Sequence, residues 1–291
     1  MVGRKGFWIA VFLIPTILIF IVIYTIPVLT VFFTSFYRWK NFEPMQFIGI
    51  NNYINILTGD EDFRVSFTNT FKWLLLQSTV HVFIGTMIAI FLSHKIRGWK
   101  FIRTAYFLPN VISSAALGML FLNIYNPQYG ILNSFIRLLG FKDFSQNWFF
   151  DDKTAFFAVT TCWLFYAGYI VLLILAQIMT LPESIHEAAI VDGATQLQYD
   201  IFVVVPLIKN IIGTSTLFAA TSMLTTFDMI YLTTNGGPMN VTLNLPLYIY
   251  HTAMIGFDTG YANTAATILI ILGIFIVISI NKIFKLNSTI Y

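Results

Sequence analysis

Charge and cysteine are both scarce in this sequence. Charged residues make up 10% of the 291 positions, whereas they make up about 25% of an average soluble domain. The single cysteine, Cys162, excludes a disulfide framework within the chain. The net charge of +3 is modest and gives no sign of a nucleic-acid partner. The histidines are scattered and form no Cys/His cluster, so no metal site is expected; they are His81, His94, His186 and His251.

Apolar and aromatic residues are abundant instead. They account for 57% and 17% of the chain, with 30 Phe. A water-soluble protein of this size could not bury so much apolar surface, so lipid must surround most of the chain. A membrane-spanning helix needs about 20 mostly apolar residues. Six segments meet this requirement and predict an all-α membrane protein, with spans at about 7–36, 73–93, 104–125, 156–181, 207–232 and 262–281.

The basic residues predict the orientation of these spans. An even number of spans puts both termini on the same side, and short loops rich in Lys and Arg lie in the cytoplasm. The loop between the second and third spans is of this kind, with Lys95, Arg97, Lys100 and Arg103. Both termini are therefore expected in the cytoplasm. The run over 7–36 is longer than the apolar core of a secretory signal, which has about 7–15 residues, so we expect it to remain as a span.

The loops suggest one transmembrane domain over residues 1–291, without a separable soluble part. The outer loops 38–64 and 126–153 are long enough for short surface helices, and 133–139 has the pattern of a helix at the membrane interface. No internal repeat is evident. Because many secondary transporters are built from inverted repeats, this disfavours that class.

The second cytoplasmic loop, 182–206, differs from an ordinary inside loop because it is long and not basic. Pro182 suits the first position of a helix, where its missing N–H costs nothing. Glu183 in the first turn complements the helix dipole, and Gly193 can supply a left-handed residue that ends the helix. The loop is therefore predicted to form a short helix followed by a turn, a structure suited to binding another protein.

This loop also carries a recognisable motif, which reads Glu187-Ala188-Ala189-Ile190-Val191-Asp192-Gly193-Ala194-Thr195, with Pro206 further on. It resembles the EAA motif of ABC importer permeases, and most of all that of the carbohydrate importers. Glu-Ala-Ala alone is common in helices, but its position between spans four and five makes the match specific. Further similarity lies at 47–53, 69–70, 103–109, 227–228 and 234–238. The last of these resembles the MalF-like rather than the MalG-like member of the permease pair.

The resemblance implies the type I ABC importer permease fold in a bacterial or archaeal cytoplasmic membrane. It also implies three protein partners: a second, MalG-like permease, a cytoplasmic ATPase dimer that holds ATP and Mg²⁺, and an extracellular solute-binding protein. The implied coupling residues are Glu187, Ala188, Ala189, Asp192 and Gly193. Glu187 would pair with a basic residue of the ATPase, and Gly193 would permit the bend. The match is imperfect at Leu197 and Asp200, where family members often carry aromatic residues, although Gln198 agrees.

A substrate cavity lined by spans four and five is also implied by the resemblance. Helical spacing puts Cys162, Phe165, Tyr166 and Tyr169 on one face of span four. Span five offers Ala219, Ser222, Met223 and Thr226. Aromatic faces that pack on sugar C–H groups, together with hydroxyls, suit a sugar or oligosaccharide. These side chains could equally serve helix packing. Asp228 is the only acid within a span, and it could bind sugar or order the turn at 233–238.

Three other functions compete with a sugar importer. An ion-gradient-driven transporter would use paired intramembrane carboxylates or broken helices at the midplane, and the spans hold one acid, near an edge. An ABC permease for a non-sugar solute, such as a glycerol phosphate, stays open. A membrane enzyme is disfavoured because no metal-ligand spacing or nucleophile motif is present. A Gly-x-x-x-x-Gly-Lys-Ser/Thr loop is also missing, so no catalytic residue or cofactor is expected in this chain.

Overall fold

The computed structural model describes residues 2–41 and 43–286, and these form two compact units. One unit is Met1–Phe63 with Tyr248–Ile271, and the other is Arg64–Leu247 with Leu272–Tyr291. The expectation of a single membrane domain stays a prediction.

The α-helices are α1 (Val2–Phe20), α2 (Ile26–Thr34), α3 (Asn51–Thr58), α4 (Glu61–Leu76), α5 (Val82–Ser93), α6 (Trp99–Phe107), α7 (Ser114–Ile124), α8 (Ile131–Leu138), α9 (Ala155–Leu164), α10 (Gly168–Ile178), α11 (Glu183–Val191), α12 (Gln196–Tyr199), α13 (Val205–Leu207), α14 (Lys209–Leu224), α15 (Asp228–Thr233), α16 (Leu245–Tyr250) and α17 (Thr259–Phe284).

In the first unit, a small hairpin follows α2. Strands β1 (Tyr37–Arg38) and β2 (Gln46–Phe47) pair antiparallel, with Tyr37 opposite Phe47. The buried Asn52 of α3 donates from Nδ2 to the carbonyl oxygens of Ser35 and Tyr37, each at 3.0 Å. Because the amide satisfies two carbonyls at the end of α2, it fixes how the chain leaves this helix.

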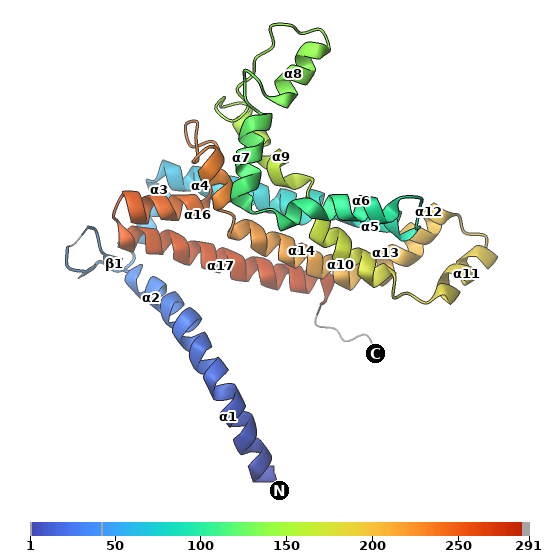
Figure 1. Cartoon of the computed structure of the whole chain (residues 1–291). Coiled ribbons are helices and arrows are strands. Elements are labelled where there is room, and N and C mark those ends of the chain that lie inside the picture. The colour runs from blue at the N-terminus through green and yellow to red at the C-terminus, as the bar shows by residue number, and fades with distance from the viewer. Residues whose placement is uncertain (1, 42, 287–291) are drawn as a thin grey trace. The chain divides into compact units, whose positions relative to one another are not determined.

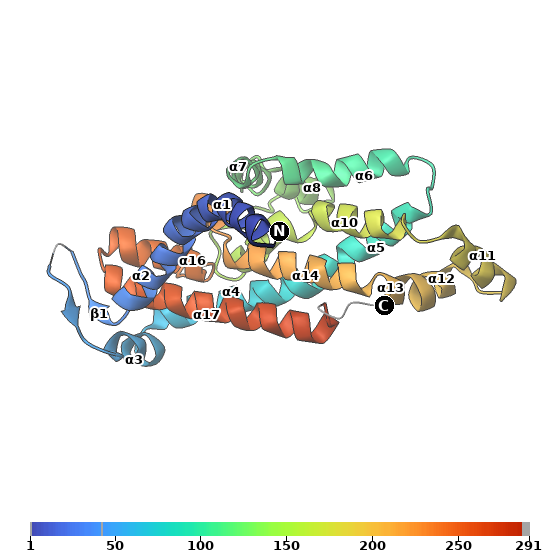
Figure 2. The ribbon, with the colours of Figure 1, turned by 90° about the horizontal axis from the view of Figure 1, so that it is seen from below.

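In the second unit, α5, α10 and α14 pack side by side (Figures 1 and 2). Gly85 of α5 makes the close approach possible, because a Cβ at this position would lie 2.6 Å from Cγ2 of Ile170 on α10. Ile170 and Ile174 of α10 are fully buried in the resulting core, together with Ala219 of α14. The EAA segment and the cavity lining described below are connected to this core.

The helices account for up to six membrane spans in the described residues. Four are long and apolar enough by themselves: Val11–Thr34, Glu61–Ser93, Ala155–Ile178 and Thr259–Phe284. Two more are bent pairs, Trp99–Val111 with Ser114–Ile124 (103°) and Gln196–Leu207 with Lys209–Leu224 (69°). The expected helix at 133–139 is present as α8, over Ile131–Leu138.

The spans expected at 104–125 and 207–232 are not continuous helices. The first of them bends because Pro109 lies in a 3₁₀ turn and Ser113, in an extended conformation, starts α7 by accepting a hydrogen bond from the Ala116 N–H at 3.3 Å. The second is interrupted because α14 ends at Leu224 and α15 begins only at Asp228. Each of these spans therefore consists of more than one helix, and their bounds in the membrane stay a prediction.

Candidate functional site

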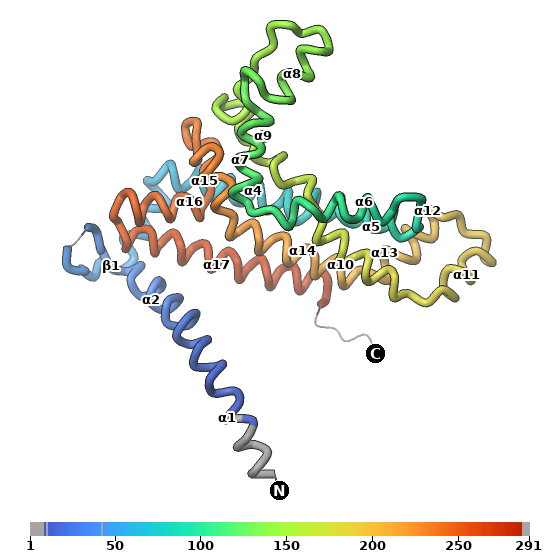
Figure 3. The backbone as a smooth tube through the Cα atoms, viewed as in Figure 1, coloured from blue at the N-terminus to red at the C-terminus, as the bar shows by residue number. Residues whose placement is uncertain are grey.

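The segment that carries the EAA motif lies between α10 and α14. Figures 1 and 2 show α11 beyond the ends of α10 and α13, and the backbone trace in Figure 3 runs out through α11 and returns through α12. The short helix is as predicted, except that Pro182 is wrong as its first residue. Pro182 has an extended ψ of 135° and caps the helix, which begins at Glu183.

The C-terminal end of α11 is built by local hydrogen bonds. Gly193 has a φ of +78°, in the left-handed region. Its N–H donates to the Ile190 carbonyl at 3.0 Å, and the Ala194 N–H donates to the Ala189 carbonyl at 2.9 Å. This pair of bonds is a Schellman motif, in which a left-handed residue satisfies the last carbonyls of a helix. The predicted use of Gly193 is therefore confirmed.

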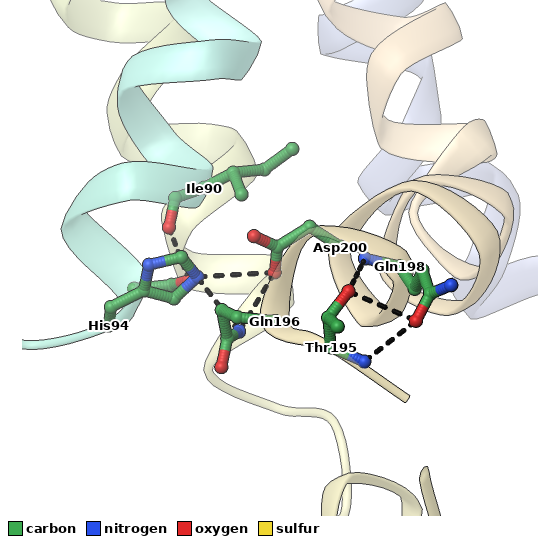
Figure 4. Close-up of polar contacts among 7 residues, drawn as sticks. Ile90, His94, Thr195, Gln196, Gln198 and Asp200 are labelled. Atoms are coloured by element: carbon green, nitrogen blue, oxygen red, sulfur yellow. Dashed lines mark hydrogen bonds and ion pairs between the residues drawn. The ribbon is translucent and has the colours of Figure 1, made fainter. Parts of the chain in front are cut away.

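A second cap starts the returning helix α12. The Thr195 N–H donates to Oε1 of Gln198 at 2.8 Å, and the Gln198 N–H donates to Oγ1 of Thr195 at 3.4 Å (Figure 4). This capping box satisfies two backbone donors at once. The turn between α11 and α12 is thus held at both sides, which gives the segment a defined shape before any partner binds.

Asp200 joins this segment to the end of α5. The residue is 8% exposed and begins the π-helical turn Asp200–Val204. Its Oδ1 lies 3.1 Å from Nε2 of His94 and 3.2 Å from Nε2 of Gln196 (Figure 4). A buried carboxylate needs such donors because it loses its water. The sequence marked Asp200 only as a departure from the family, and the structure supplies its partners.

The predicted coupling residues lie on a surface without intramolecular cover. No residue of α11 is buried, and Glu187, Ala188, Asp192 and Gly193 are exposed, with Ala189 half-buried. Ile190 is 59% exposed and Val191 86% exposed. Exposed aliphatic side chains beside an acidic residue, on a helix that projects from the bundle, make a surface suited to protein contact.

A cavity of about 270 Å³ lies within the second unit. It includes five of the residues expected along the substrate pathway, namely Tyr166, Tyr169, Ser222, Met223 and Thr226. Its other lining residues are Gln77, His81, Pro109, Asn110, Ile112, Ser114, Leu117, Cys162, Trp163 and Met229. Residues from both sides of the bend near Pro109, and from both sides of the break between α14 and α15, therefore meet at one place.

Four buried polar atoms of this lining have no hydrogen-bond partner in the described structure: Oε1 of Gln77, Nε2 of His81, Nε1 of Trp163 and the hydroxyl of Tyr169. Leaving such atoms unpaired costs about 1–3 kcal/mol each. Gln77 and His81 begin and end the π-helical turn Gln77–His81, and such turns are frequent at functional sites. A bound molecule or water would satisfy all four atoms.

The protonation of His81 follows from its neighbour. Its Nδ1 lies 2.7 Å from the carbonyl oxygen of Leu164, which can only accept, so Nδ1 carries a proton. In the neutral ring Nε2 is then an acceptor. The lining therefore offers hydrogen-bond acceptors from Gln77 and His81, a donor from Trp163, and the hydroxyl of Tyr169, which can donate or accept.

Two expected pathway residues, Phe165 and Asp228, are not among the residues that line this cavity, and their place along the pathway stays a prediction. Phe165 is half exposed and does not line it, because α9 ends at Leu164 and the helical spacing is broken before α10. Asp228 is exposed in the first turn of α15. Gln77, His81 and Trp163 were not expected as lining residues, although two polar residues four apart in an apolar run, Gln77 and His81, were a signal.

Comparison with known proteins agrees with this architecture. The chain is 32% identical to the probable ABC transporter permease protein YurN of Bacillus subtilis, over 94% of both chains. It is 26% identical to the trehalose/maltose transport system permease protein MalF of Thermococcus litoralis, over 94% of this chain and 92% of that protein. A crystal structure of a bacterial ABC transporter that imports the acidic polysaccharide alginate superposes with a TM-score of 0.86, at 20% identity over 98% of both chains.

A match over the larger part of the chain shows its family. Residues 81–286 match the family described as binding-protein-dependent transport system inner membrane component. This stretch contains the EAA segment and most of the cavity lining. The expected importer-permease fold is confirmed by the superposition, and the expected location in the membrane by the family. The chain belongs to the inner membrane components of binding-protein-dependent transport systems, and is a multi-pass permease subunit of an ABC importer.

Proposed function

We propose that this chain forms half of the translocation pathway for a sugar or oligosaccharide. A solute-binding protein on the outer side would deliver the substrate, and a second, MalG-like permease would form the other half. A cytoplasmic ATPase dimer would bind ATP and Mg²⁺ and drive the cycle, because no phosphate-binding loop is found in this sequence.

The cavity with its four unpaired polar atoms carries this proposal. Sugar hydroxyls both donate and accept, so they can match the acceptors of Gln77 and His81 as well as the donor of Trp163. The rings of Trp163, Tyr166 and Tyr169 add apolar faces for sugar C–H groups. The likeness to a trehalose/maltose permease supports the same substrate class.

The alternatives find less support in this lining. Neither Lys nor Arg is among the described residues that line the cavity, so a glycerol phosphate would meet no cationic partner there. No carboxylate is among these described lining residues either, since Asp228 is elsewhere, and ion-coupled transporters use such groups.

The coupling proposal concerns α11. Glu187 would pair with a basic residue of the ATPase, and Ala188 and Ala189 would allow close approach. Gly193 would form the bend, with Asp192 beside it. The exposure of Ile190 and Val191 supports this, because a partner would bury both side chains.

The second permease would cover an apolar hollow next to the cavity. This hollow has a volume of about 530 Å³ and shares Tyr169 and Ser222 with the cavity. Its remaining lining is apolar: Phe107, Leu172, Leu173, Ala176 and Phe218. A matching apolar partner surface would close one side of the pathway.

The proposal is tested by purifying the chain with its co-expressed partners in lipid nanodiscs and screening ATPase stimulation. The panel would contain maltose, trehalose, raffinose, glycerol-3-phosphate and methionine, each with the binding protein. At least one sugar should raise ATP hydrolysis, and Tyr169→Phe should weaken that stimulation without loss of assembly. Stimulation by glycerol-3-phosphate or methionine alone would refute the sugar assignment.

A further inference from the structure

We propose that His94 and Asp200 form a latch through which movement of the coupling segment is passed to α5 and, along α5, to the cavity wall. The inference rests on the proposed function, because it assumes that an ATPase moves α11. It concerns positioning residues of the transport cycle, since neither side chain lines the cavity.

The first step is the chemistry of the contact. His94 ends α5, and Asp200 follows α12. The Asp200 carboxylate can only accept, so the His94 Nε2 at 3.1 Å must donate to it. Gln196 adds a second donor at 3.2 Å and also lies 3.1 Å from Nε2 of His94 (Figure 4). A hydrogen bond to a charged group is stronger than one between neutral groups, and the Asp200 side chain is largely buried at 11% exposed, whereas that of His94 is 29% exposed.

The second step is what lies between α11 and α5. A hollow of about 510 Å³ is lined by the end of α5, the end of α10, and residues of α11 and α12. With this hollow between them, α11 reaches the end of α5 by way of α12. One contact already joins these two helices, because the ring of His186 lies edge-on against Tyr199 with 4.6 Å between centroids. Asp200, which directly follows α12, then makes the hydrogen bond to His94 at the end of α5.

The third step is the helix behind His94. α5 continues without interruption from the π-helical turn Gln77–His81 to Ser93. His81 at one end lines the cavity, and His94 at the other end holds Asp200. At 1.5 Å per residue the two histidines lie about 20 Å apart along a single helix. Pulling on His94 therefore moves His81 and Gln77, whose polar atoms face the proposed substrate.

The contact also has a natural control on the same segment. Asp200 and His94 meet across 106 residues of sequence, and neighbouring residues of the turn make separate contacts. Gln198, which agrees with the family, belongs to the capping box on the same turn and does not take part in the contact. It provides a matched control on the same segment.

The test compares sugar transported per ATP hydrolysed in proteoliposomes that hold the complete complex, with the sugar that stimulates the wild type most. His94→Leu and Asp200→Leu remove the contact, whereas His94→Gln and Asp200→Asn keep a donor or an acceptor. We expect each leucine variant to keep the co-purifying ATPase and its basal hydrolysis but to transport about tenfold less sugar per ATP. The double leucine variant should be no worse than either single variant, because one contact is lost once.

The conservative variants should recover most of the ratio, and Gln198→Glu, which keeps the acceptor of the capping box, should leave it unchanged. An unchanged ratio of sugar transported to ATP hydrolysed in both leucine variants would overturn the latch. A double variant whose ratio falls by the two single-variant factors multiplied together would overturn it as well. Loss of the ATPase from both leucine complexes would also overturn it, since the contact would then serve assembly alone. Uptake by the wild type that needs no ATP would instead refute the proposed function, and the latch with it.

Discussion

The Nδ1 atom of His81 donates a 2.7 Å hydrogen bond to the carbonyl oxygen of Leu164, the last residue of α9. The bond ties the π-helical turn Gln77–His81 to the point where the fourth span breaks before α10. His81 is 2% exposed, and its ring packs near those of Trp163 and Tyr169. This single contact thus satisfies the carbonyl of Leu164 at the break between α9 and α10, and it leaves Nε2 of His81 as the ring nitrogen available to the cavity.

The first prediction follows from this geometry. His81→Leu should raise the sugar concentration for half-maximal uptake about tenfold, because one cavity acceptor is lost. Thr86→Val is a matched control on the chain's second span: Thr86 is buried, bonds the Val82 carbonyl at 2.8 Å, and does not line the cavity. Uptake kinetics in proteoliposomes check the prediction, and equal effects of the two variants would assign His81 to packing.

The second prediction concerns Glu187. Glu187→Lys should leave membrane insertion intact but abolish binding of the ATPase and sugar uptake, because the charge that we propose to meet a basic residue is reversed. Glu183→Lys, one turn earlier on the same exposed helix, should cost at most about 1 kcal/mol of helix stability through the dipole. Co-purification of the ATPase with each of the two variants measures whether binding is lost. Normal uptake by the Glu187 variant would remove the docking proposal.

The third prediction concerns Gly193. No atom lies within 4 Å of a Cβ built at this position, so Gly193→Ala meets only backbone strain, about 1–2 kcal/mol at φ +78°. We expect faster amide exchange over 183–199 and a lower transport rate, with Gly193→Asn milder because Asn tolerates this conformation. Gly140, at φ +109° and equally free of neighbours, is the control that carries similar strain after α8. Gly140→Ala should leave exchange over 183–199 unchanged; a shared effect would contradict a local role for Gly193.

The fourth prediction tests the packing of α5 on α10. Gly85→Ala places a methyl group 2.6 Å from Cγ2 and 3.0 Å from Cβ of Ile170, so the two helices must separate. Overpacking of this kind costs about 1–3 kcal/mol. A lower midpoint of thermal unfolding in detergent is expected, whereas Gly59→Ala, whose nearest neighbour would be at 3.4 Å, should change it little. An unchanged midpoint for Gly85→Ala would show that the interface is looser than described.

The features that could be predicted from sequence are those with local causes. The short helix α11 and its end at Gly193 follow from residues within a few positions of each other, and so does the left-handed conformation of the glycine. Tyr166, Tyr169 and Ser222 were expected at the cavity from the family resemblance and helical spacing, and they line it. Phe165 does not line it because helical spacing assumes an unbroken helix, and no proline in the sequence marks the break before Gly168.

The features that could not be predicted depend on contacts distant in sequence. Asp200 finds His94 across 106 residues, and His81 finds Leu164 across 83. Neither contact has a periodic or motif signature, since each depends on how separate helices pack. For this reason the sequence marked Asp200 only as a departure from the family and His81 only as one of four scattered histidines, although the structure gives both of them specific partners.

Uptake of radiolabelled sugar into proteoliposomes that contain the complete complex and its binding protein, with and without internal ATP, tests most directly whether this chain serves an ATP-driven sugar importer coupled through α11. We expect uptake that requires ATP, persists when an uncoupler collapses ion gradients, and disappears with Glu187→Lys. Uptake that proceeds without ATP and stops with the uncoupler would refute an ATP-driven importer.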